Sequence, residues 1–172
     1  DNIPAKSDIL VEHLENNGGV IYAKSNTPEF GAGANTFNEV FGATRNPWDT
    51  SRSAAGSSGG AAVALATGTA WLAHGSDMGG SLRNPASFCG IVGLRPTYGT
   101  VSRYGIVAFA SSLDQVGPTA KTVRDTALLY RIIAGRDLCD STTVDVPPVE
   151  LPEAEDLRGL RVGAPKELNE LE

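Results

Sequence analysis

The sequence predicts an α/β fold, in which short strands alternate with helices. Three observations support this prediction: an apolar run of strand length, an uncharged stretch rich in alanine and leucine, and an amphipathic stretch with a helix cap, at residues 89–94, 61–70 and 122–134. A chain of 172 residues has the size of a single domain with one core.

The elements before residue 50 are short and are separated by turn residues. Ser7 is a favourable N-cap, and the pair Gly18-Gly19 can end a helix. Proline is tolerated in a first helical turn, which favours a helix at Pro28. In chain order we expect a helix over 8–17, a buried strand over 20–23, a short helix at 27–29 and a loop over 40–50.

The second half of the chain contains the clearest helix signal. Thr122 and Asp125 are spaced as an N-terminal cap, and Gly135 stops the helix. One face carries the apolar residues Val123, Ala127, Tyr130 and Ile133. The strand over 89–94 is expected to end in a turn at Arg95-Pro96.

The whole chain is interpreted as one partial domain, 1–172, with three parts. These are a core at 7–135, an exposed connection rich in proline and acid at 136–156, and the start of a further strand at 157–172, with its apolar residues at 160–164.

Composition argues against several classes of function. The net charge of −6 and the isoelectric point near 4.9 disfavour direct nucleic-acid binding, which needs a basic surface. We recognise no secretory leader and no apolar run of about 18 residues, so a cytoplasmic protein without membrane contact is expected. Cys89 and Cys139 are too few and too far apart for a metal site or a disulfide framework.

Several apolar residues are interpreted as parts of the core. Cys89 lies in an apolar stretch and is expected to be a small, reduced core residue. The aromatic side chains are expected in the core rather than around a substrate: Trp48, Trp71, Phe88, Tyr104 and Phe109.

Two serine-bearing glycine loops flank the stretch 61–70. They run from Gly56 to Gly60 and from Gly75 to Ser81. Glycine permits positive φ and lets backbone N–H groups approach a ligand. A flexible linker is not normally followed by an apolar stretch and a second glycine turn, and a phosphate-binding loop requires a Gly-Lys-Ser/Thr ending that is missing here. The two loops together favour a nucleophilic serine site.

These motifs resemble the amidase signature family of serine hydrolases. The resemblance rests on residues 53–62, 74–96 and 111–118, and it extends over 7–166. Residues 9–96 are most similar to free-standing amidases, whereas 98–146 are most similar to the A subunit of the tRNA-dependent glutamine amidotransferase. The resemblance implies an α/β/α sandwich with a mixed central sheet, here truncated because the enzymes of the family are longer.

The resemblance also implies roles for the two loops. Ser81 would be the nucleophile, Ser57 would relay protons and follow a cis peptide bond, and Ser58 would support the network. Asp77 and Arg83 would fix the loop as an ion pair, with an ordinary surface salt bridge as the alternative. The oxyanion hole would be built from the backbone N–H groups of Met78, Gly79, Gly80 and Ser81.

The base of the family is a lysine upstream of the serine loops, in a motif that this chain lacks. Lys6 is interpreted as a solvated charge, and Lys24 matches the family pattern without its catalytic role. His74 lies close enough in sequence for a Ser-His-Asp triad to be considered, but an ordinary packing or hydrogen-bonding role is favoured for it. The isolated chain is therefore expected to be inactive.

The function that these features imply is amide C–N hydrolysis through a serine acyl-enzyme. The substrate would be glutamine or another carboxamide, no cofactor is implied, and partner subunits of an amidotransferase are implied for the leading version. A free-standing amidase and an inactive remnant that keeps the glycine loops are the alternatives.

Overall fold

The computed structural model describes residues 3–147, 149–151 and 158–166. A three-stranded sheet in the order β3-β5-β4 lies at its centre, and both strand pairs are antiparallel. The strands span Leu72–Asp77 (β3), Val92–Gly93 (β4) and Gln115–Ala120 (β5).

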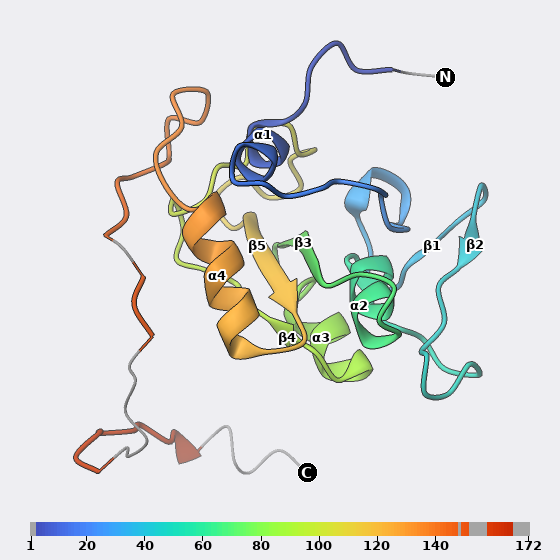
Figure 1. The fold of residues 1–172 in the computed structure, drawn as a ribbon. Coiled ribbons are helices and arrows are strands. Elements are labelled where there is room, and N and C mark those ends of the chain that lie inside the picture. The colour runs from blue at the N-terminus through green and yellow to red at the C-terminus, as the bar shows by residue number, and fades with distance from the viewer. Residues whose placement is uncertain (1–2, 148, 152–157, 167–172) are drawn as a thin grey trace.

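Helices cover both faces of this sheet (Figure 1). Helix α4 (Val123–Ile133) lies on one face together with α1 (Ile9–Asn16), and α2 (Gly59–Ala66) and α3 (Arg83–Cys89) lie on the other. We call these the α4 face and the α2 face. The predicted α/β class with its helix-sheet-helix layers is confirmed.

Each face of the sheet has its own apolar cluster. Val116 of β5 packs with Leu10, Val101, Leu129 and Ile133 on the α4 face. Because side chains alternate along a strand, the neighbours of Val116 point to the α2 face, where Ala54, Ala62 and Cys89 form the second cluster. Cys89 is fully buried and both cysteines are free, as the sequence predicts.

Strand β5 is buried along its whole length, although its sequence did not predict a strand. Gly117 and Pro118 weaken the local signal, because both residues are disfavoured within strands. The fold requires this glycine, since a Cβ atom added there would lie 2.1 Å from the Leu94 carbonyl oxygen. Close packing across the α2 face thus selects a residue that local propensity disfavours.

Helix α4 confirms its predicted caps. The Thr122 hydroxyl accepts a hydrogen bond from the Asp125 N–H, and Gly135 follows the helix with a φ of 136°. The buried face differs from the predicted one at Val123, which is exposed, and at Leu129, which is buried. Val123 lies in the first turn, so the contacts with the sheet are made by residues further along the helix.

Several elements near the N-terminus differ from the prediction. Asp8 rather than Ser7 occupies the N-cap of α1, without a side-chain cap. The predicted strand over 20–23 is wrong: this segment pairs with no described strand, and Val20 and Tyr22 are exposed. The predicted short helix is a 3-10 turn, Glu29–Gly31, preceded by Pro28.

The hairpin formed by β1 (Phe37–Asn38) and β2 (Gly42–Ala43) lies partly within the predicted loop over 40–50. The alanine-rich helix spans Gly59–Ala66 instead of 61–70, because Gly68 has a φ of 75° that ends it. The predicted strand over 89–94 reduces to Val92–Gly93, since Cys89 belongs to α3, which was not predicted.

The later segments also correct two expectations. The described part of 160–164 forms no strand, and Leu160 and Val162 are exposed. The rest of the predicted strand region, at 157 and 167–172, lies outside the described residues. The segment 136–156, which was expected to be an exposed connection, has three buried polar residues near its start. Hydrogen bonds hold them against the core: Asp137, Asp140 and Thr143.

The aromatic residues that were expected in the core are exposed. Their exposed fractions run from 43% for Tyr104 to 87% for Trp71. The other three, Trp48, Phe88 and Phe109, lie between these values. Aromatic type alone therefore did not indicate burial in this chain.

Candidate active site

The two serine loops meet at the α2 face of the sheet. Ser58 is the N-cap of α2, and its backbone N–H donates a hydrogen bond of 3.3 Å to the Ser81 carbonyl oxygen. The peptide bond between Gly56 and Ser57 is cis, as the family resemblance implies. Ser57 is buried and Ser81 is half-buried, so the predicted nucleophile is the more accessible of the two.

The glycines of the loops allow backbones and side chains to approach closely. An added Cβ at Gly60 would lie 2.3 Å from the Asn26 carbonyl oxygen, and one at Gly56 would lie 2.7 Å from the carbonyl carbon of Asn35. One at Gly75 would lie 2.2 Å from the Ser58 hydroxyl oxygen. Strand β3 therefore presses directly against the first serine loop, and only glycine fits at these contacts.

Asp77 is the anchor of the second loop. Its fully buried carboxylate accepts hydrogen bonds from the backbone N–H groups of Gly80 (2.7 Å), Leu82 (3.1 Å) and Arg83 (3.4 Å). The Arg83 guanidinium adds two hydrogen bonds of 3.0 Å, and Arg95 Nε lies 3.4 Å from Asp77 Oδ1. The pair Asp77–Arg83 is thus no ordinary surface salt bridge, because the carboxylate is enclosed and ties β3 to the start of α3.

The charge on Asp77 is stabilised by these donors. Burial raises the pKa of the carboxyl, but hydrogen bonds from Arg83, Leu82 and Gly80 outweigh burial, so that the pKa lies below its ordinary value. A carboxylate at this place also interacts favourably with the N-terminal end of α3.

Replacing this anchor is expected to destabilise the chain. In Asp77→Asn the side-chain NH₂ group replaces one of the two acceptor oxygens, so it faces backbone N–H groups that need an acceptor. One buried N–H group is then left unpaired, which lowers the free energy of unfolding by about 1–3 kcal/mol. Because the pKa of Asp77 is lowered, its stabilising effect is present above the ordinary carboxyl pKa of about 3.9 and is lost as the pH falls below that value. Urea unfolding at pH 7 and pH 3 measures both effects.

The matched control for this variant is Asp49→Asn. Asp49 pairs with Arg52 on the surface, where 78% of the Arg52 side chain is exposed, and such pairs contribute little. We expect Asp49→Asn to change the free energy of unfolding much less than Asp77→Asn at pH 7, because the Ser51 hydrogen bonds that lower the pKa of Asp49 are exposed to solvent. A free energy of unfolding of Asp77→Asn equal to that of the control at pH 7 contradicts the anchoring role.

One of the four predicted oxyanion-hole donors already has a partner in the structure. The Gly80 N–H donates to Asp77, so it is already engaged. Within the described part of the chain, the N–H groups of Met78, Gly79 and Ser81 form no hydrogen bond. These three N–H groups are therefore the donors that we favour, and Gly80 has a φ of 134°.

His74 and the lysines lie away from the serines. His74 and Gly75 are consecutive in β3, so His74 points to the α4 face, where it interacts electrostatically with Asp8. Lys6 is exposed and stands over the ring of Tyr104, and Lys24 is exposed. The structure thus places His74 on the opposite face of the sheet from the serine loops, and its side chain is exposed.

Asp114 and Gln115, at the start of β5, have structural roles. Asp114 accepts hydrogen bonds from the backbone N–H groups of Phe109 and Ala110 and closes the loop before β5. Gln115 is fully buried in β5, directly opposite Asp77 in the sheet register. Both residues therefore support the structure around the second loop rather than line an open site.

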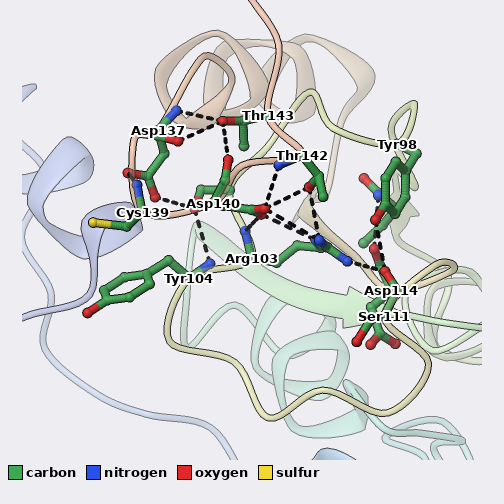
Figure 2. A network of polar contacts seen from close by, with 12 residues as sticks. Tyr98, Arg103, Tyr104, Ser111, Asp114, Asp137, Cys139, Asp140, Thr142 and Thr143 are labelled. Carbon is green, nitrogen blue, oxygen red and sulfur yellow. Dashed lines mark hydrogen bonds and ion pairs between the residues drawn. The ribbon is translucent and has the colours of Figure 1, made fainter.

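A second polar network fixes the segment that leads to β5 (Figure 2). Asp140 accepts hydrogen bonds from the Arg103 backbone and guanidinium and from Thr142. Burial raises the pKa of Asp140, but these hydrogen bonds outweigh burial and lower it. Arg103 also donates to the Ser111 carbonyl oxygen, as does the Tyr98 hydroxyl. This explains why the start of the expected exposed connection is buried.

The described residues contain no group of three or more His, Cys, Asp or Glu side chains placed to hold a metal ion. In the same part of the chain, no helix is long and apolar enough to cross a membrane.

The layered fold and the joined serine loops match those of one family of known proteins. The family model described as Amidase matches residues 1–172, and the chain belongs to this amidase signature family. The chain is 54% identical over 170 residues to the A subunit of glutamyl-tRNA(Gln) amidotransferase from Carboxydothermus hydrogenoformans, covering 96% of the chain and 34% of that protein. It is 50% identical over 167 residues to the corresponding protein of a Sulfurihydrogenibium species, again covering 96% and 34%.

Solved structures show the same likeness. The A subunit of glutamyl-tRNA(Gln) amidotransferase from Thermotoga maritima superimposes with a TM-score of 0.77 at 55% identity, over 80% of this chain and 30% of that one. A peptide amidase in complex with chymostatin superimposes with a TM-score of 0.76 at 40% identity, over 82% and 30%. The chain thus spans about a third of the length of the relatives that it matches.

Proposed function

We propose that the chain supplies the serine-bearing part of an active site that hydrolyses a carboxamide. The hydrogen bond between Ser58 and Ser81 carries this proposal, because it joins the buried serine loop to the accessible one. Ser81 Oγ attacks the carbonyl carbon, and the N–H groups of Met78, Gly79 and Ser81 stabilise the oxyanion. The C–N bond breaks, ammonia leaves with a proton passed through Ser57, and water releases the acid from Ser81.

The proton acceptor in this proposal is a lysine outside residues 1–172. The lysines at positions 6, 24, 121 and 166 are all exposed, and in the part of the chain that the structure describes none of them forms a hydrogen bond with Ser57 or Ser81. Relatives of the chain are much longer, since the matched region covers 34% of the Carboxydothermus protein. Residues 1–172 alone are therefore expected to release ammonia only at the background rate.

The version we favour is the glutaminase component of a tRNA-dependent amidotransferase. Two curated relatives, at 54% and 50% identity, are named as the A component of glutamyl-tRNA(Gln) amidotransferase, and the matches run through both halves of the chain. Glutamine is then the amide substrate, partner subunits use the ammonia, and the reaction takes place in the cytoplasm. The likeness to a peptide amidase, at 40% identity, favours a free-standing amidase as the second candidate.

A chimera tests this proposal. Residues 1–172 replace the matched region of the Carboxydothermus protein, and ammonia release is measured with glutamine and with a simple carboxamide, with and without the partner subunits and glutamyl-tRNA. We expect release from glutamine that the partners and tRNA stimulate. Release from simple carboxamides that no partner affects favours the free-standing amidase. A folded chimera that hydrolyses neither substrate contradicts the proposed function.

A further inference from the structure

Thr36 is a buried residue that neither the sequence motifs nor the catalytic roles include. It lies just before β1, and its side chain contacts Gly59 at the start of α2. Its side chain is almost fully buried, with an exposed fraction of 2%. Its carbonyl oxygen accepts a hydrogen bond of 2.9 Å from the Thr44 N–H, which fixes the residue to the β1–β2 hairpin.

The Thr36 hydroxyl contacts the first serine loop on both sides of Ser57. Thr36 Oγ1 accepts a hydrogen bond of 3.0 Å from the Gly59 N–H. It lies 2.9 Å from the Ala55 carbonyl oxygen and 3.3 Å from the Ser57 carbonyl oxygen. A hydroxyl has one hydrogen to donate, so the shorter contact, to Ala55, is the main one. A single side chain thus bridges the residues before and after Ser57.

The loop is shaped to receive this hydroxyl. A Cβ atom added at Gly59 would lie 2.4 Å from Thr36 Oγ1, so glycine at this position makes the contact possible. Gly59 is also the first residue of α2, whose early N–H groups have no partner within the helix. Thr36 satisfies one of these groups, a role that a side chain at the N-cap usually has.

We infer that Thr36 is a positioning residue of the hydrolytic site: its hydroxyl clamps the backbone around Ser57 and thereby holds the Ser57 side chain in place beside Ser81. This inference rests on the proposed function for its catalytic consequence, while the clamp itself is a property of the chain. A misplacement of a catalytic group by about 1 Å costs about 10²-fold in rate.

The chain offers a matched control for this clamp. Thr126 in α4 has an exposed fraction of 3%, and its hydroxyl donates one hydrogen bond of 2.8 Å to the Thr122 carbonyl oxygen. Thr126→Val removes a buried hydroxyl from the α4 face. Thr36→Val removes one of similar burial from the serine loop, and Thr36→Ser keeps the hydroxyl there. Any effect of losing a buried hydroxyl in general is common to both valine variants.

Hydrogen exchange on residues 1–172 tests the clamp without reference to activity. We expect the Gly59 N–H to exchange at least about tenfold faster in Thr36→Val, because it loses its acceptor, and at nearly the wild-type rate in Thr36→Ser and Thr126→Val. Gly59 exchange in Thr36→Val equal to that in Thr126→Val overturns the clamp.

Kinetics of the chimera test the consequence. We expect kcat for ammonia release to fall by about 10²-fold in Thr36→Val with little change in KM, to recover in Thr36→Ser, and to stay near wild type in Thr126→Val. Faster exchange at Gly59 with an unchanged kcat overturns the positioning role. An inactive wild-type chimera contradicts the proposed function instead, and hydrogen exchange still decides whether Thr36 is the clamp.

Discussion

The Ser81→Ala variant of the chimera is expected to lose amide hydrolysis almost completely, by roughly 10⁶-fold, the loss seen when a nucleophile is removed from a set of groups that act as a unit. The fold is expected to remain intact. Ser81 is half-buried, and its hydroxyl forms no hydrogen bond with the described residues. Its removal therefore leaves neither a cavity nor an unpaired buried group. Ammonia release and circular dichroism measure the two properties.

A serine close to the loop serves as the control for this variant. Ser87 is exposed on α3, in the helix that follows Ser81. Ser87→Ala is expected to keep full turnover. If Ser81→Ala retains turnover well above background while its circular dichroism is normal, another residue is the nucleophile.

Ser57→Ala is expected to have the second largest effect, a loss of about 10²- to 10⁴-fold in the rate of acylation, the contribution of assisted proton transfer. Ser58→Ala is expected to have a milder effect. The Ser58 hydroxyl donates to the Ser76 carbonyl oxygen at 3.3 Å, so it supports β3, whereas the Ser57 hydroxyl has no described partner and remains available to the reaction.

Rapid-quench measurement of the acyl-enzyme separates these two serines. The relay role predicts slow acylation in Ser57→Ala and nearly normal acylation in Ser58→Ala. Equal losses in both variants argue that the first loop acts only through its backbone and that Ser57 relays no proton.

The sequence predicted the elements whose ends are determined by contacts between residues close together in the chain. The cap at Thr122 and the end at Gly135 define α4, because both act within one turn of the helix. Strand β5 was not predicted, because it depends on contacts between residues far apart in the chain. Gly117 is required by close packing against Leu94, which is distant in sequence, and this packing overrides the low strand propensity of glycine. Pro118, which is fully buried in the same strand, weakens the local signal further.

The site was predictable where glycine and serine form a compact motif. The structure brings Ser58 and Ser81 together as the two loops implied. The role of Thr36 could not be predicted, because its partners, Ala55 and Gly59, lie about twenty residues further along the chain. A single threonine without a surrounding motif does not indicate such a contact. The engagement of the Gly80 N–H with Asp77 was also unpredictable, since it depends on the turn that the second loop makes.

Covalent labelling with a fluorophosphonate, followed by mass spectrometry of the labelled peptide, tests the central claim most directly. In the chimera, we predict one adduct on the peptide that contains Ser81, lost in Ser81→Ala and retained in Ser58→Ala. An adduct on a different residue, or labelling that Ser81→Ala leaves unchanged, contradicts the assignment of Ser81 as the nucleophile.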